Sequence, residues 1–88
     1  MSLATSNISI GTTATLIATG KVGASWIYLH APTGGNTIYV GTSAVTTSTG
    51  MELPKGALNV LWIAETDNLY GIVATGTQPL MVMQSGGR

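Results

Sequence analysis

SWIYLHA, residues 25–31, is the stretch that decides the fold. Successive side chains of a β-strand point to opposite faces, so the odd and even positions of this stretch line two different faces. One face would carry Trp26, Tyr28 and His30, and the other Ile27, Leu29 and Ala31. A strand with one face in water shows a polar residue at every second position, whereas here both faces carry bulk. We therefore expect the second face to be covered by another sheet or another subunit.

The rest of the chain repeats this strand spacing and shows no sustained period of 3.6 residues. Short apolar or alternating segments stand between Gly, Pro, Asn and Thr residues at 7–10, 13–19, 37–41, 58–64, 68–75 and 79–84. The pattern predicts an all-β fold, a small antiparallel β-sandwich or barrel of about seven short strands. Residues 1–8 are expected to form an N-terminal arm, 9–84 a single β domain, and 85–88 a loose C-terminal tail.

The composition indicates a protein that associates with neighbours. Charged residues make up only 7% of the 88 residues, the formal net charge is zero, and fourteen Thr, seven Ser and twelve Gly supply most of the polar surface. A neutral surface lacks the repulsion that keeps free domains apart, which favours a homo-oligomer over the alternative, a hydroxyl-rich monomer. Three scattered cations argue against a nucleic-acid partner, and no apolar run is long enough for a membrane span.

Few residues are candidates for chemistry. His30 is the only histidine, its sequence neighbours supply no acidic partner, and a structural or interface role suits it better than catalysis. Glu65 and Asp67 straddle a predicted turn and are two ligands where calcium takes six to eight oxygens. With no cysteine and no activated serine, we predict no catalytic, cofactor-binding or metal-binding residue and no enzyme activity, a small hydrolase being the weakest alternative.

The aromatic residues and the long hydroxyl-rich connection complete the set of predicted contact residues. Because the chain has no Phe, Trp62 and Tyr70 are expected in the core. The connection over residues 41–53 is expected to cross from one sheet to the other, pinned by its apolar residues, with Thr and Ser hydroxyls satisfying its backbone. The predicted interface residues are Trp26, Tyr28, His30, Tyr39, Val45 and Met51.

Residues 38–77 also carry a resemblance to a known class of proteins. Ile38-Tyr39-Val40-Gly41 is followed by Val45-Thr46, by Gly50, Leu53 and Gly56, and then by Asn68-Leu69-Tyr70-Gly71-Ile72, with a short strand after Gly76-Thr77. This order resembles a pattern of small structural proteins in the virions of tailed bacteriophages. The chain departs from the pattern at Gly71, where Ala is usual, and at Thr42, where Gly is usual.

The resemblance implies a structural role. It implies a capsid decoration or cement protein that binds the outer shell of the virion and stabilises it as a homo-oligomer, with a homotrimer expected. The implied partners are the major capsid protein and further copies of the chain, and the implied location is the capsid surface after synthesis in the host cytoplasm. The alternative is a head-fibre or tail-associated module that recognises a host surface glycan or receptor.

Overall fold

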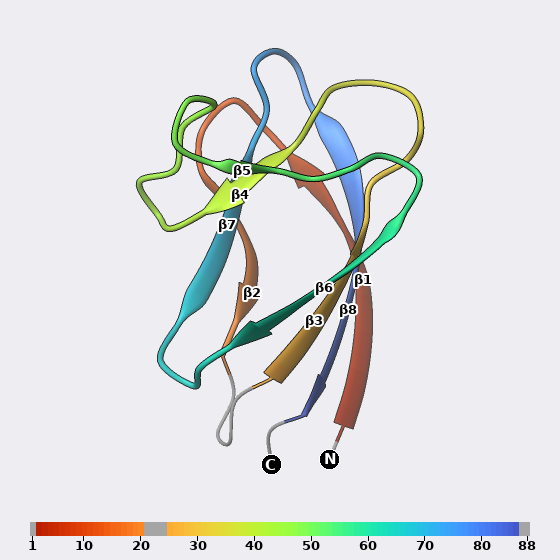
Figure 1. Cartoon of the computed structure of the whole chain (residues 1–88), viewed down its shortest axis with the longest axis vertical. Coiled ribbons are helices and arrows are strands. Elements are labelled where there is room, and N and C mark those ends of the chain that lie inside the picture. Colours follow the sequence, from red (N-terminus) through yellow and green to blue (C-terminus); the bar gives the residue numbers. More distant parts are fainter. Residues whose placement is uncertain (1, 21–24, 87–88) are drawn as a thin grey trace.

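Two antiparallel sheets pack face to face in the structure, a computed structural model that describes residues 2–20 and 25–86 (Figure 1). Sheet A has the order β1 (Ser2–Ile10), β8 (Gln78–Gly86), β3 (Ser25–His30), β6 (Leu58–Ile63). Sheet B has the order β2 (Thr15–Thr19), β7 (Asn68–Ile72), β4 (Tyr39–Gly41), β5 (Met51–Glu52). The predicted all-β sandwich is confirmed. The described residues form eight strands, and the two-residue β5 is the one that the sequence pattern did not predict.

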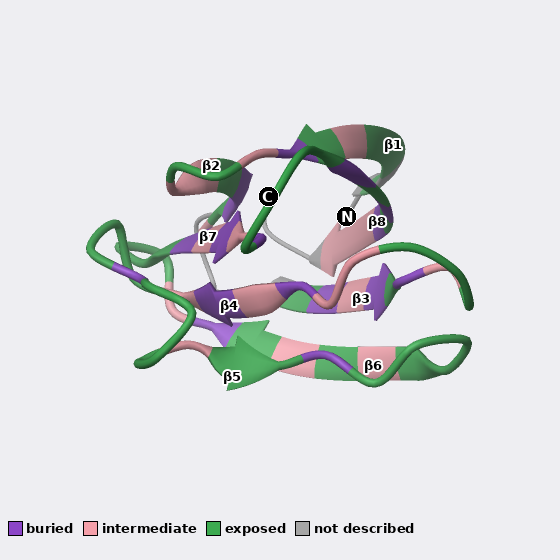
Figure 2. Cartoon of the chain, turned by 90° about the horizontal axis from the view of Figure 1, so that it is seen from above, coloured by how far each residue is buried: buried purple, intermediate pink, exposed green. Residues whose placement is uncertain are grey.

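The chain alternates between the two sheets. Every connection between consecutive strands crosses from one sheet to the other, except the connection between β4 and β5, which stays in sheet B. Seen from above, the four strands of sheet A lie along one side of the molecule and the four of sheet B along the other (Figure 2). Because of this route, neighbours within a sheet are often distant in sequence, as β1 and β8 are.

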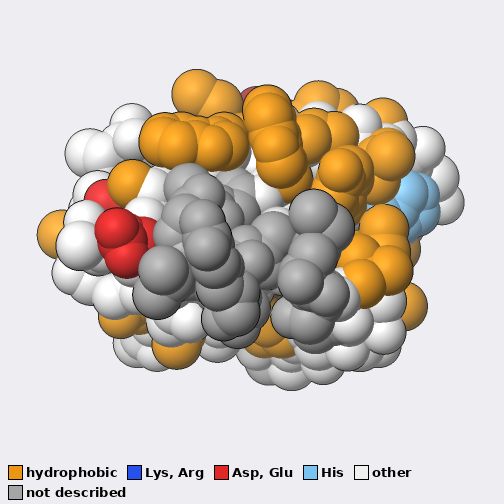
Figure 3. Space-filling view, turned by 90° about the horizontal axis from the view of Figure 1, so that it is seen from below, with side chains coloured by type: hydrophobic (Ala, Val, Ile, Leu, Met, Phe, Trp, Pro, Cys, Tyr) orange, Lys and Arg blue, Asp and Glu red, His pale blue; other side chains and the backbone are white. Residues whose placement is uncertain are grey.

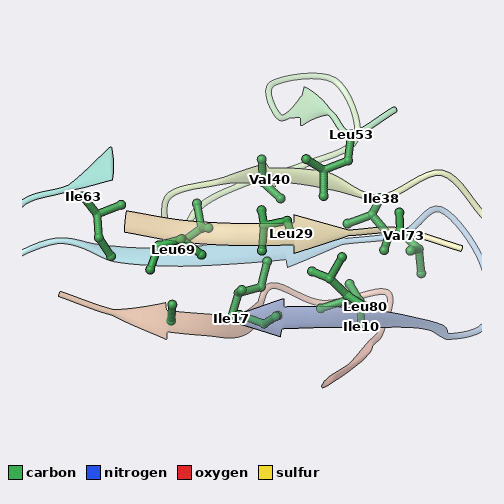
Figure 4. Packing of buried hydrophobic residues seen from close by; sticks show 14 residues of the cluster. Ile10, Ile17, Leu29, Ile38, Val40, Leu53, Ile63, Leu69, Val73 and Leu80 are labelled. Atoms are coloured by element: carbon green, nitrogen blue, oxygen red, sulfur yellow. The ribbon is translucent and has the colours of Figure 1, made fainter. Parts of the chain in front are cut away.

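The core lies between the inner faces of the sheets (Figure 4). Ile27 and Leu29, the inward residues of the opening stretch, have no exposed surface, and burial of such a side chain contributes roughly 1.5–3 kcal/mol. On β7, a Cβ at Gly71 would lie 2.8 Å from Cδ1 of Ile17 and 3.5 Å from Cδ1 of Ile10. The missing side chain at Gly71 therefore leaves the space that these isoleucines fill.

The expected N-terminal arm is part of sheet A. Ser2–Ile10 pairs with β8 along its whole length, from Ser2 opposite Gly86 to Ile10 opposite Gln78. The prediction of an arm was wrong because residues 2–9 are mostly small or polar, and the backbone hydrogen bonds of a ladder need no apolar side chain. At the other end, residues 85 and 86 of the expected tail belong to β8, and residues 1, 87 and 88 lie outside the described residues.

The connection between β4 and β5 folds over the outer face of sheet B instead of crossing between sheets. Val45 is 5% exposed, and its Cγ2 lies 3.0 Å from where a Cβ of Gly41 would be and 2.8 Å from where a Cβ of Gly50 would be. Gly50 in turn lies against Tyr39, because a Cβ on Gly50 would be 2.7 Å from Cβ of that tyrosine. The expected crossing was wrong, because β4 and β5 pair directly.

Hydroxyl groups satisfy the backbone of this connection, as predicted. The amides of Ser48 and Thr49 both donate to Oγ1 of Thr46, at 3.2 Å each, and the amide of Thr46 donates to Oγ1 of Thr49 at 3.1 Å. The backbone adds a bond from the amide of Gly50 to the carbonyl of Thr46 at 2.8 Å. The segment is therefore a folded cover with local hydrogen bonds, and we call the outer face of sheet B the covered face.

Candidate protein-binding face

The outer face of sheet A has no such cover, and strand register arranges its side chains in three rows. The residues opposite one another across β1, β8, β3 and β6 are Leu3, Ser85, Trp26 and Trp62 in the first row, Thr5, Met83, Tyr28 and Val60 in the second, and Asn7, Met81, His30 and Leu58 in the third. Residues opposite one another in a sheet point to the same side. We call this surface the open face.

The open face holds most of the exposed apolar bulk. Eight large apolar side chains are exposed in the described residues, and six of them lie here: Leu3, Trp26, Leu58, Val60, Trp62 and Met81. Trp26 is 51% exposed and Trp62, directly opposite on β6, is 57% exposed. Figure 3 shows hydrophobic side chains gathered along one side of the molecule, next to the histidine. Exposed apolar patches on proteins are often interaction sites, which makes this face the candidate.

A hollow of about 230 Å³ opens on the same face, beside the tryptophan row. It is lined by Thr5, Ser6, Tyr28, His30, Leu58, Met81, Val82 and Met83, from all four strands of sheet A. Pockets that bind small molecules usually measure about 300–1,000 Å³, so this hollow is small for such a ligand. Its size and apolar lining suit a single large side chain from another protein.

Charge is missing from the open face. None of the twelve positions in its three rows is Asp, Glu, Lys or Arg. The described acidic residues lie elsewhere, with Glu52 on β5 and Glu65 and Asp67 in the turn after β6. The face can therefore be desolvated without burying a permanent charge.

The structure separates the six residues that the sequence predicted for an interface. Trp26, Tyr28 and His30 lie together on the open face. Tyr39 lies on the covered face and is half-buried, and Met51 is 69% exposed at the edge of sheet B. Val45 is buried within the monomer, so its place in an interface was wrong: it packs its own loop onto sheet B.

Sequence reasoning missed the residues of β6 and β8 on this face. Trp62 was expected in the core, and that prediction was wrong because the inward residue at this end of β6 is Ile63. The alternation over 58–63 contained the signal, since Leu58, Val60 and Trp62 share one face. The alternation did not show which of the two faces points outward.

The remaining candidates for chemistry have structural roles or stand apart. Asp67 shapes the turn after β6: its Oδ2 accepts from the amide of Ala64 at 3.3 Å, and its carbonyl accepts from the amide of Gly20 at 2.7 Å. Across residues 2–20 and 25–86, no three His, Asp or Glu side chains converge as metal ligands would. In the same residues no helix has the length and apolarity to cross a membrane.

Comparison with known proteins defines the fold and no family. No family model matches the chain, and no curated protein matches it significantly in sequence. Among solved structures, it is similar to a protein of Bacillus endospore appendages, which form a novel family of disulfide-linked pili. The TM-score is 0.62 at 13% sequence identity, over 99% of this chain and 87% of that one. A likeness at this identity shows the fold alone, a β-sandwich shared with a structural protein.

Proposed function

We propose that this protein is a structural module that assembles with other protein subunits through its open face and so stabilises a larger particle. The observation that carries the proposal is the contiguous, uncharged apolar surface of sheet A, with two half-exposed tryptophans opposite each other. In the form that the sequence resemblance implies, the particle is a tailed-phage capsid and the protein decorates its outer shell as a homo-oligomer. The proposal assigns no reaction to the chain.

The physical mechanism is mass action. A protein that binds only the assembled shell stabilises it by an amount that grows with the concentration of free protein. Desolvating an apolar surface contributes about 25 cal/mol per Å² before the costs of association. The pilus protein of similar fold gives a precedent for assembly by such a sandwich, with a difference in linkage: that family is disulfide-linked, and this chain has no cysteine. Assembly here would be non-covalent.

Particle composition tests this proposal. Virions purified by density gradient from lysates of the source strain should contain the chain in many copies, and particles made without it should lose their genome at a lower temperature. A chain found only in the soluble fraction, with shells equally stable in its absence, would overturn the proposal. A Trp62→Glu protein added to the deficient particles should restore less shell stability than the unaltered protein does, because it spoils the open face.

A second candidate function is glycan recognition, favoured by the facing Trp26 and Trp62 side chains. Exposed aromatic rings offer a flat apolar surface on which a sugar ring can stack, with the indole N–H as a donor. Ser85 and Tyr28, beside Trp26, supply hydroxyl groups for a sugar, whereas Val60 and Leu58, beside Trp62, supply no hydrogen-bonding side chain. Retention of a sugar on a glycan array, abolished by Trp26→Ala, would favour the glycan.

A further inference from the structure

We infer that the partner seated on the open face is a second copy of this chain, related by a two-fold axis that lies in the interface. This inference rests on the proposed function and names the subunit that the face binds. In the pair, the tryptophan row of each copy, Trp26 and Trp62, lies over the hollow of the other. The strands of the two facing sheets run antiparallel to each other.

The arrangement of the face carries the inference. The exposed indoles of Trp26 and Trp62 lie in the first row, and the hollow lies over the second and third rows, between Tyr28, His30 and Met81. A projection and a depression on one surface meet twice when a two-fold axis in the interface passes midway between them. A two-fold interface must be self-complementary in this sense, with the same patch contributed by both copies. The open face meets that requirement.

The area of the face suits a small, specific interface. Four strands about 4.8 Å apart, with six to nine residues at about 3.4 Å each, give a surface of roughly 500 Å² on each copy. Two copies would bury about 1,000 Å², near the lower limit for specific association. The two indoles alone contribute roughly 200 Å² of exposed surface, given 150–250 Å² for a whole aromatic side chain. We therefore expect a Kd in the micromolar range.

The electrostatics favour a like partner. A side chain close to the two-fold axis meets its own copy, so a charge there would face a like charge in the pair. The twelve row positions of the open face carry no permanent charge, so two copies meet without that cost. A partner recognised by charge complementarity would find nothing to pair with here, whereas a second copy needs only matching shape and apolar surface.

The first experiment uses the tryptophans themselves as reporters. Both tryptophans of the chain lie on the open face, so burial on association shifts their emission to shorter wavelength. Light scattering should show a mass moving from one to two times 9.0 kDa with rising concentration, and the emission shift should follow the same curve. Trp62→Glu should weaken association at least about thirty-fold, the effect of losing an interface hot spot. Leu16→Glu, on the covered face, is the control and should leave it unchanged.

The second experiment tests the two-fold exchange of projection and hollow. Trp62→Glu removes an indole from the tryptophan row, and Met81→Lys places a charge in the lining of the hollow. Each variant alone should therefore stay monomeric. When they are mixed, the intact Trp62 of one meets the intact hollow of the other, and the new carboxylate faces the new ammonium. The mixture should therefore recover a mass of two chains. Thermal unfolding of each variant shows separately that the monomers remain folded.

The possible results distinguish failure of the two-fold pairing from failure of the proposed function. A mass of three chains, a mass of one chain at millimolar concentration, or no recovery on mixing overturns the two-fold pairing. If the unaltered chain stays monomeric yet is abundant in purified virions, the proposed function survives and the inference fails. If it pairs as described but is absent from every particle, the inference survives and the proposed function fails.

Discussion

The outer faces of the two sheets differ in what covers them. On sheet B, the connection from β4 to β5 folds back over its own sheet, and Val45 closes over Gly41 and Gly50. On sheet A, no segment of the described chain lies over the outer face, and the facing Trp26 and Trp62 stay half-exposed. The same sandwich therefore has one outer face partly covered by its own loop and one outer face that the described chain leaves open.

The comparison teaches how a small domain reaches sufficient burial. A domain of this size buries only roughly 60–65% of the surface of its unfolded chain, so its core is thin. Sheet B gains extra burial from a local loop, which requires only nearby residues to order. Sheet A has strands of up to nine residues and leaves apolar side chains of its outer face exposed. Replacing one valine on each face by aspartate, Val45 on the covered face and Val60 on the open face, tests this difference between the two sheets.

The largest effect on stability is expected from Val45→Asp. This change puts a carboxylate into a site that is 5% exposed and lined by Gly41 and Gly50, with no cation among these contacts. Burial of an unpaired charge should lower the free energy of unfolding by about 3 kcal/mol or more. For a domain of this length the midpoint of thermal unfolding should fall by more than about 12 °C.

The control for this variant is Thr47→Asp, which adds the same charge to an exposed position of the same loop. It should change the free energy of unfolding by less than about 0.5 kcal/mol. Equal and small effects of the two substitutions would show that Val45 does not hold the loop on sheet B. In that case the covered face would be as open as the other one.

A smaller loss of stability is expected from Gly50→Ala, which tests how closely the loop lies on the sheet. The new Cβ would be 2.7 Å from Cβ of Tyr39 and 2.8 Å from Cγ2 of Val45, so the loop must move outward. Such overpacking should cost about 1–3 kcal/mol in urea denaturation. Gly34→Ala is the matched control, since a Cβ there meets nothing within 4 Å, and its stability should be unchanged or slightly raised.

The sequence predicted the fold class because alternation is a local property. Ile27 and Leu29 were assigned to one face and Trp26, Tyr28 and His30 to the other, and both assignments agree with the structure. What covers each face depends on pairings between distant residues, such as Leu3 with Ser85, and these leave no local trace. For that reason the sequence detected two bulky faces without showing which one stays open.

Trp62 and Val45 both show that the local sequence did not determine which side chains are buried. Size and apolarity suggested the core for Trp62, yet its strand lies at the edge of sheet A and turns the indole outward. Val45 was predicted as an interface residue, yet the loop folds onto Gly41 and buries Val45 within the monomer. In both cases the local sequence did not show whether the side chain would be buried, because burial depends on residues that are distant in sequence.

A loss of about 0.5–1.5 kcal/mol is expected from Thr46→Val, which removes a hydroxyl from the cover of sheet B. Oγ1 of Thr46 accepts from two backbone amides and lies 3.0 Å from Oγ1 of Thr49. These bonds are exposed, so water replaces them in part and the cost stays modest. Amide exchange of Ser48 and Thr49 should accelerate more than that of core strands. Thr47→Val, the matched change at the next residue, should accelerate neither amide.

The smallest effect on stability, and the largest on association, is expected from Val60→Asp. Val60 is 46% exposed in the middle row of the open face, opposite Tyr28, and an aspartate there keeps its carboxylate in water while the chain is monomeric. The free energy of unfolding at low concentration should fall by about 1 kcal/mol or less, the range of strand propensity.

In the two-fold pair the same carboxylate would be desolvated and would lie near its own symmetry copy. Sedimentation should therefore find only monomer at concentrations where the unaltered chain pairs. The contrast with Val45→Asp is then complete: Val45→Asp lowers the stability of the monomer, and Val60→Asp prevents pairing while the monomer stays folded. A Val60→Asp protein that still pairs would show that association uses a surface other than the open face.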